Sequence, residues 1–273
     1  MSAGPERTER KARQGERLQR LVFGEDAGLY DRARPSYPPA LVDEVVSLAG
    51  AGATCLDVGC GTGKATVLLA ARGTAGVGVE ADAEMAAVAR RNLADFASWR
   101  VDVCGFEEWG PGEKGPDHFD LVCSAQAWHW LDPAVRLHKA HALLRPGGWV
   151  ALWWNRPDDK APEALHGEID RIYAEIAPEV AAKNSMGGRG PQPAHEDVPP
   201  ELAFATPVRR CYRWEKDYSA GEWASLLRTQ SDHRLLPPGR LDELTGRVQE
   251  AIEAAGGVYR HKYACWLWAV QKL

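Results

Sequence analysis

Short apolar runs typical of β-strands alternate with helical stretches between Thr54 and Asn155. This alternation is the pattern of βαβ units, in which parallel strands form a sheet and helices cover its faces. The last helix of this region ends at Arg145-Pro146-Gly147-Gly148, because proline and glycine do not continue a helix. The sequence therefore predicts an α/β, doubly wound Rossmann-like core. Its expected strands are residues 54–58, 76–80, 99–103, 119–125 and 149–154, with helices at 64–72, 82–93 and 133–144.

Regular patterning returns near the C-terminus, with expected strands at 208–214 and 262–270 and helices at 221–228 and 240–255. The short connection at 256–263 favours an antiparallel final strand at the sheet edge. The complete prediction is a mostly parallel seven-stranded sheet with an antiparallel edge strand.

The intervening segment is rich in charge, proline and glycine, notably at 186–191, and is predicted to be a mobile insertion. Four parts follow: an N-terminal helical lid segment (1–40), the core (41–155), an insertion or substrate cap (156–205), and C-terminal elements that complete the sheet (206–273). The apolar residues Leu18, Leu21 and Val22 make a helix plausible in the first part.

Composition narrows the possible partners. A net charge of -5 and a pI near 5.9 argue against affinity gained by neutralising phosphates, so no nucleic-acid partner is expected. The six cysteines are scattered, without metal-ligand spacing, and are interpreted as reduced core thiols, with no metal. No signal peptide or membrane-length apolar run occurs, so the expectation is a soluble cytoplasmic protein without a membrane partner.

The glycine-rich turn from Leu56 to Gly63 follows an apolar strand and opens a helix, which indicates a cofactor loop. A phosphate-binding P-loop is excluded, because Ala65 follows Gly63-Lys64 and Val58 stands where the first glycine is required. A dinucleotide fingerprint is weakened by its glycine spacing but stays open.

The sequence Asp-Val-Gly-Cys-Gly-Thr-Gly at 57–63 resembles the first motif of class I S-adenosylmethionine-dependent methyltransferases. The resemblance extends over most of residues 24–155, with further matches at Val77-Gly78-Val79-Glu80, Phe119-Asp120-Leu121-Val122 and Leu144-Arg145-Pro146-Gly147-Gly148. It implies S-adenosylmethionine as the cofactor of the core.

This resemblance also implies roles for individual residues. The loop residues Gly59, Cys60, Gly61 and Gly63 would lie against the methionine part of the cofactor, and Asp57 would orient it. Three residues around the next strand end are implied as cofactor contacts as well: Glu80, Ala81 and Met85.

Both strand-end assignments have alternatives. Glu80 would accept the ribose hydroxyls, or else cap the helix that begins near Asp82. Met85 would pack near adenine, or else belong to the ordinary core. The family commonly places an Asp in the loop after the third strand, but this chain has Cys104-Gly105-Phe106-Glu107-Glu108. Phe106 and Glu107 remain candidates for the adenine contact, and an exposed acidic turn is the alternative.

The segment Ser124 to Pro133 resembles a subgroup of small-molecule methyltransferases that includes the trans-aconitate type. At the carboxyl end of a strand it would border the ligand site. Cofactor contacts are assigned to Ser124, Ala125 and Gln126, and acceptor contacts to Trp128, His129, Trp130, Trp154 and Asn155.

His129 is a candidate general base, with a role in shaping the pocket as the alternative. The segment Tyr30 to Pro38 resembles the part of the same subgroup that folds over the cofactor, so Tyr30 and Arg34 are candidate contacts. Arg34 would pair with a carboxylate of the cofactor or substrate, or else form a surface salt bridge.

Together these features predict an enzyme that transfers a methyl group from S-adenosylmethionine to an O, N or C atom of a small molecule, in specialised metabolite biosynthesis. An alternative keeps the cofactor but uses it for cyclisation or elimination without methyl transfer. A nicotinamide dehydrogenase and a non-catalytic binding module are disfavoured alternatives. A homo-oligomer is possible on this evidence.

Overall fold

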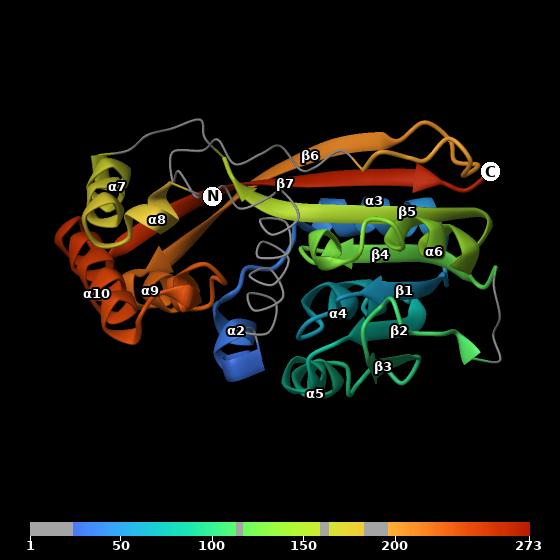
Figure 1. Ribbon diagram of the computed structural model, residues 1–273, viewed down its shortest axis with the longest axis horizontal. Coiled ribbons are helices and arrows are strands. Elements are labelled where there is room, and N and C mark those ends of the chain that lie inside the picture. Colours follow the sequence, from blue (N-terminus) through green and yellow to red (C-terminus); the bar gives the residue numbers. More distant parts are fainter. Residues whose placement is uncertain (1–23, 113–116, 159–163, 183–195) are drawn as a thin grey trace, which may run out of the picture.

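The computed structural model of the protein is shown in Figure 1 and describes residues 24–112, 117–158, 164–182 and 196–273. The helix expected around Leu18 and the proline- and glycine-rich stretch 186–191 lie outside these residues. In the described ranges, no helix is both long and apolar enough to cross a membrane.

Seven strands form one sheet in the order β3-β2-β1-β4-β5-β7-β6, and the first five are parallel. The strand β7 runs antiparallel to both of its neighbours, β5 and β6. The expected mostly parallel fold with an antiparallel edge is confirmed. The strand bounds are β1 Thr54–Val58, β2 Ala75–Glu80, β3 Trp99–Val103, β4 Phe119–Ala125, β5 Leu144–Pro157, β6 Val208–Ser219 and β7 Val258–Gln271.

One detail differs from the expected order, because β7 lies inside the sheet and β6 forms the edge. The burial patterns explain this placement. Most of β7 is buried, so both of its sides are covered, whereas β6 alternates exposed charged residues with partly buried ones. Charged side chains suit an edge strand, since they discourage pairing with another chain.

Helices cover both faces of the parallel part of the sheet. Successive residues of β1 point to opposite faces, so Cys55 and Leu56 belong to different core clusters. The first cluster includes residues of α3, α4 and α5, and the second includes Leu137 and Leu143 of α6. The doubly wound arrangement is therefore present. The helix bounds are α3 Pro39–Ala49, α4 Lys64–Ala70, α5 Ala83–Asn92 and α6 Arg136–Leu143.

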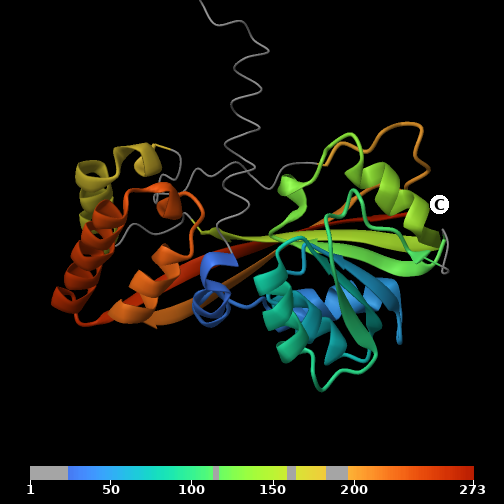
Figure 2. The same cartoon turned by 60° about the horizontal axis from the view of Figure 1, so that its bottom comes forward.

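The C-terminal helices form a separate lobe with its own apolar cluster. Figures 1 and 2 show this lobe at one end of the long strands β5, β6 and β7, with the parallel core at the other end. The short helix α2 (Ala27–Ala33) lies between them and contacts both α5 and α9. The lobe consists of α7 Ala164–Ile176, α8 Pro178–Ala181, α9 Ala220–Arg228, a 3₁₀ turn at His233–Leu235 and α10 Pro238–Ala254.

The helix α7 corrects the expectation of a mobile insertion, which covered residues 156–205. Ile169, Ile172, Tyr173 and Ile176 are buried in the lobe at helical spacing. This spacing is present in the sequence, but the surrounding charged and proline-rich residues obscure it. The part of the expected insertion that contains α7 is therefore packed structure.

Candidate functional site

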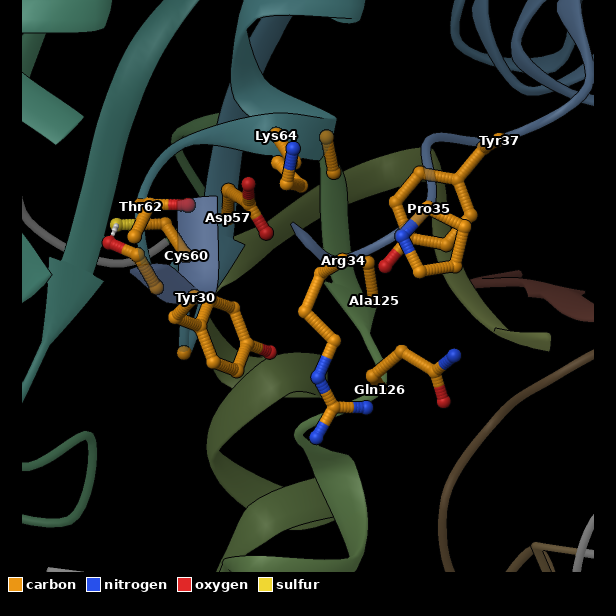
Figure 3. Close-up of a pocket in the computed structure, with 13 residues that line it drawn as sticks. Tyr30, Arg34, Pro35, Tyr37, Asp57, Cys60, Thr62, Lys64, Ala125 and Gln126 are labelled. Atoms are coloured by element: carbon orange, nitrogen blue, oxygen red, sulfur yellow. Dashed lines mark hydrogen bonds between the residues drawn. The ribbon is translucent and has the colours of Figure 1, made fainter. Parts of the chain in front are cut away.

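Two adjoining cavities lie at the carboxyl ends of β1, β2 and β4, where open α/β sheets bind their ligands. They share a common wall: Tyr30, Gly59, Gly61, Ala125 and Gln126. The polar cavity (Figure 3) is completed by Arg34, Pro35, Tyr37, Asp57, Cys60, Thr62, Lys64 and Ala65. The apolar cavity is completed by Val79, Glu80, Ala81, Asp82, Met85, Cys104, Gly105, Phe106, Glu107, Ala127, Trp130 and Leu131.

The glycine loop is held against the end of β2, because the backbone N–H groups of Gly59 and Cys60 both donate to the Val79 carbonyl, at 2.8 and 3.1 Å. Gly59 has φ +67°, and a Cβ there would lie 2.5 Å from the Ala127 Cβ. A side chain at this position would therefore strain the backbone and push away the segment after β4. Glycine is required at position 59 by the protein's own packing as well as by any ligand.

The three loop glycines differ in position. Gly59 and Gly61 line both cavities, whereas Gly63 lines neither of them and stands at the start of α4. A Cβ at Gly63 would lie 3.3 Å from the Ala89 Cα, so this glycine allows α4 and α5 to pack closely.

Asp57 is fully buried at the floor of the polar cavity. Its Oδ2 accepts a 2.6 Å hydrogen bond from the Thr66 hydroxyl, its Oδ1 has no hydrogen-bond partner among the described residues, and the weak thiol donor of Cys123 lies near the carboxyl group. Burial raises the Asp57 pKa to about 6, the Thr66 bond opposes the shift, and the Glu80 charge adds to it. A buried carboxylate with an underused oxygen on a cavity wall calls for a donor from a ligand.

Two cations face the same cavity. The Arg34 Nη2 donates to the Thr229 carbonyl at 2.7 Å, and its guanidinium lies 5.0 Å from the Tyr30 ring centre. This contact joins the cavity to the C-terminal lobe and replaces the simple surface salt bridge considered for Arg34. Lys64 lies 3.9 Å from the Asp31 carboxylate, and partial burial lowers the Lys64 pKa.

Glu80 is fixed at the boundary between β2 and the glycine loop. Its Oε2 accepts from the Gly61 N–H at 2.8 Å, and its Oε1 accepts from the Asp82 N–H at 2.9 Å. Burial raises the Glu80 pKa, which these hydrogen bonds oppose. The helix cap considered as an alternative role is Asp82, whose carboxylate accepts from the Glu84 and Met85 N–H groups. Glu80 instead presents a carboxylate to the apolar cavity.

The base of the apolar cavity is formed by buried side chains. Met85 and Phe106 are almost fully buried and line the cavity. Met85 also belongs to a small cluster with Ala27 and Val88, so both interpretations of this residue agree with the structure. Glu107 lines the cavity while its Oε1 accepts from the Asp132 N–H at 2.9 Å.

Gln126 has φ +65°, in the left-handed region that non-glycine residues rarely occupy. Its N–H donates to the Trp153 carbonyl at 3.0 Å, and its side-chain amide donates to the Asn155 carbonyl at 3.3 Å. Such a conformation persists only where the surroundings impose it, and it is enriched at functional sites. Gln126 lines both cavities, next to Ala125.

Several other candidates from the strand-end region face the protein interior. The Ser124 hydroxyl donates to the Val58 carbonyl, and Trp128 and Trp154 are buried in the core. The Asn155 side chain accepts from Trp214 and donates to the Ser36 carbonyl. None of these four lines either cavity.

His129 and Trp130 are adjacent, but only Trp130 lines a cavity. His129 is an exposed residue, and the protein atoms around it partly desolvate its ring. This desolvation, with the nearby charges of Arg156 and Arg136, lowers the His129 pKa to about 4. The imidazole is therefore neutral at neutral pH and is a weak base.

Sequence reasoning missed Tyr37, Lys64 and Leu131 as cavity residues. Each directly adjoins or lies within a segment that was singled out, so extending the predicted contacts along those segments would have found them. The cavity position of Lys64 follows from the loop, which places the first turn of α4 beside the polar cavity.

Comparisons with known proteins agree with this geometry. Residues 56–152 match the methyltransferase domain family. An uncharacterized methyltransferase of Mycobacterium bovis is 41% identical over 140 residues, which cover 51% of this chain and 54% of the relative. A Saccharomyces cerevisiae protein, provisionally named an S-adenosylmethionine-dependent methyltransferase, is 31% identical over 144 residues, with 50% and 48% coverage.

A solved structure from Anaeromyxobacter dehalogenans, provisionally described as a type II methyltransferase, is 24% identical and superimposes with a TM-score of 0.57. The similarity covers 86% of this chain and 97% of the other and confirms the expected fold. The matches show that residues 56–152 are similar to a methyltransferase domain. The chain spans about half the length of the curated relatives it matches, so the activity of the whole protein is a proposal.

Proposed function

We propose that this chain is an S-adenosylmethionine-dependent methyltransferase with a small-molecule acceptor. The observation that carries the proposal is the pair of adjoining cavities at the strand ends, together called the cleft, with the buried Asp57 carboxylate lining one cavity and Glu80 lining the other. The two carboxylates lie on either side of the loop that contains Gly59 and Gly61.

The functional groups of S-adenosylmethionine match the residues of this cleft. Its ammonium group supplies the donor that the Asp57 Oδ1 needs, and its carboxylate complements the positive charges of Arg34 and Lys64. The ribose hydroxyls match the Glu80 carboxylate, which keeps acceptor capacity beyond its two backbone bonds. The adenine ring matches the apolar surface of Met85 and Phe106.

When bound, the cofactor supplies an electrophilic methyl group on a sulfonium sulfur. The residues of this chain position it and exclude water, since much of the acceleration of an in-line displacement comes from alignment in a dry site. The residues shared by both cavities, including Tyr30 and Gln126, occupy the centre of the cleft, where the reacting groups would meet. The fixed left-handed backbone of Gln126 holds one wall of that centre in place.

The acceptor side includes Trp130 and the contact between Arg34 and Thr229, which brings the C-terminal lobe next to the cleft. This arrangement supports a role for the lobe in acceptor binding. We assign the acceptor to the small molecules of specialised metabolism, with O, N or C as the methylated atom. The resemblance of residues 124–133 to the trans-aconitate type supports that assignment. General-base catalysis by His129 is the disfavoured role, because its lowered pKa makes the ring a weak base and it lines neither cavity.

The test is to incubate the purified protein with methyl-labelled S-adenosylmethionine and a panel of small acids, amines, phenols and carbon nucleophiles. The proposal expects a labelled product and demethylated cofactor in equal amounts. Conversion of an acceptor with no demethylated cofactor would instead indicate cyclisation or elimination. Absence of S-adenosylmethionine binding would refute the proposal.

A further inference from the structure

Lys139 reaches from α6 to the loop that closes the apolar cavity. Its ammonium donates to the Glu107 carbonyl at 3.0 Å and also to the Trp109 carbonyl. The same nitrogen lies 5.1 Å from the centre of the Phe106 ring. Lys139, which lies outside the cavity, therefore contacts three residues of this loop: Phe106, Glu107 and Trp109. Phe106 and Glu107 also line the apolar cavity.

The loop is tied to the same region of the chain by a second bond. The Glu107 carboxylate accepts from the Asp132 N–H, and Asp132 directly follows Leu131, which also lines the apolar cavity. In both attachments the donor belongs to residues 131–139 and the acceptor to the loop: Lys139 donates to two loop carbonyls, and the Asp132 N–H donates to a loop carboxylate. The position of Phe106 and Glu107 is thus set by residues 131–139.

The charges explain why a cation is needed there. A Cβ at Gly105 would lie 2.3 Å from the Glu108 Oε2 and 3.6 Å from the Glu107 Oε2, so two carboxylates crowd the start of the loop. Both carboxylates belong to the same short loop, where their like charges repel. Partial burial lowers the Lys139 pKa, while the charges of Glu107, Cys104 and Glu108 favour the ammonium. The lysine offsets the acidic loop while satisfying its carbonyls.

We propose that Lys139 is a positioning residue that holds the loop from Cys104 to Trp109 in its binding conformation, so that Phe106 and Glu107 form a ready-made site for the base of the cofactor. The inference rests on the proposed function, because it assigns the base to the apolar cavity. Preorganisation of this kind increases affinity, since the loop does not have to be ordered during binding.

The experiment is calorimetric titration of the full chain with adenosine and with S-adenosylhomocysteine. Lys139→Met keeps the apolar stem but removes the donors, and we expect both ligands to bind about tenfold more weakly, as for a lost charged hydrogen bond. Lys139→Arg should restore affinity to within about threefold of the original protein, since it keeps the charge and the donors. His138→Ala is the matched control, because that neighbouring side chain faces Glu201 on the surface.

Hydrogen exchange tests the cause of the change. In Lys139→Met, amides at 104–109 should exchange faster, while those of the glycine loop at 56–63 keep their protection. Lys139→Gln provides a second variant if Lys139→Met does not fold. It removes the charge and shortens the donor, so amides at 104–109 should again exchange faster than in the original protein.

Unchanged adenosine affinity in Lys139→Met, or equal loss in Lys139→Arg and Lys139→Met, would overturn the inference, as would unchanged exchange at 104–109 in Lys139→Gln. If the original protein binds neither ligand, the proposed function itself fails. The two failures are therefore distinguishable.

Discussion

The two ends of the cleft are built by different means. The polar cavity contains one buried carboxylate, Asp57, and two cations, Arg34 and Lys64, whose charges are only partly matched by the protein. The apolar cavity is formed by side chains that are already packed, such as Met85 and Phe106, and its charged groups are held by backbone bonds. The polar cavity should therefore select its ligand by charge, and the apolar cavity by shape. Changes at the two ends should therefore respond differently to pH.

Glu80 holds the glycine loop through Gly61 and also lines the apolar cavity, so its loss should have the largest effect on cofactor affinity. Glu80→Ala removes the acceptor for the Gly61 N–H and the carboxylate offered to the ribose. Charged hydrogen bonds contribute about 1.5–3 kcal/mol each, so S-adenosylmethionine should bind at least about 100-fold more weakly by calorimetry. The exposed neighbour Glu84→Ala is the control and should bind normally. If Glu80→Ala binds S-adenosylmethionine as tightly as the original protein, the proposed roles of Glu80 in holding the loop and in binding the ribose are both contradicted.

Asp57→Asn isolates the polar end. The substitution removes the charge but leaves an oxygen that accepts from Thr66, so S-adenosylmethionine affinity should fall about tenfold to thirtyfold. Without ligand, the melting temperature at pH 7.5 should rise by about 3 °C, because a buried and incompletely paired carboxylate destabilises the fold. The exposed Asp95→Asn should change neither quantity. A lower melting temperature with unchanged affinity would show that Asp57 is purely structural.

The pH dependence of the same end follows from the raised Asp57 pKa. With a pKa of about 6 against an ordinary value of 3.8, the folded protein binds more protons between these values, so Asp57 adds stability as the pH falls from 6 to 4. S-adenosylmethionine affinity should do the opposite, falling by up to about tenfold per pH unit below 6, because its ammonium needs the charged carboxylate.

Adenosine is the internal control for this prediction, since it occupies only the apolar end. Parallel titrations at pH 5 and 7.5 should show a larger change for S-adenosylmethionine, which meets both Asp57 and Glu80, than for adenosine, which meets only Glu80, whose pKa burial also raises. Equal pH dependence of the two ligands would break the distinction between the ends.

His129 should have the smallest effect. Its ring lines neither cavity, so we expect His129→Gln to change the turnover number by less than about threefold. A general base contributes about 100-fold to 10,000-fold to the reaction rate. Steady-state kinetics with an acceptor that the protein methylates therefore separates a general base from a residue that only shapes the pocket. A loss of 100-fold would establish His129 as the base and require the ring to reach the centre of the cleft.

The sequence predicted the parts of the fold that depend on local patterns. The glycine loop, the acidic end of β2 and the strand-helix alternation all appear at the expected residues, because turn chemistry and burial determine them locally. The helix α3 was not predicted, although Pro39 at its start and the buried Leu41, Val42 and Val45 follow a helical pattern.

Side-chain direction after β4 could not be predicted in the same way. Ser124 and Ala125 point to opposite sides because strand residues alternate, so only Ala125 reaches the cavities. The chain then enters a 3₁₀ turn at Trp128–Trp130, in which each residue turns by about a third of a circle. Trp128 therefore enters the core while Trp130 lines the apolar cavity, a distinction that depends on the tertiary path of the chain.

The central claim is that the cleft binds S-adenosylmethionine with its charged end at Asp57 and its base at Phe106. Calorimetric titration of the purified protein with S-adenosylmethionine, its demethylated product and NAD tests this most directly. We predict binding of the first two, with weaker binding of both by Glu80→Ala, and no comparable binding of NAD. Tight binding of NAD with no response to the other two ligands would contradict the claim.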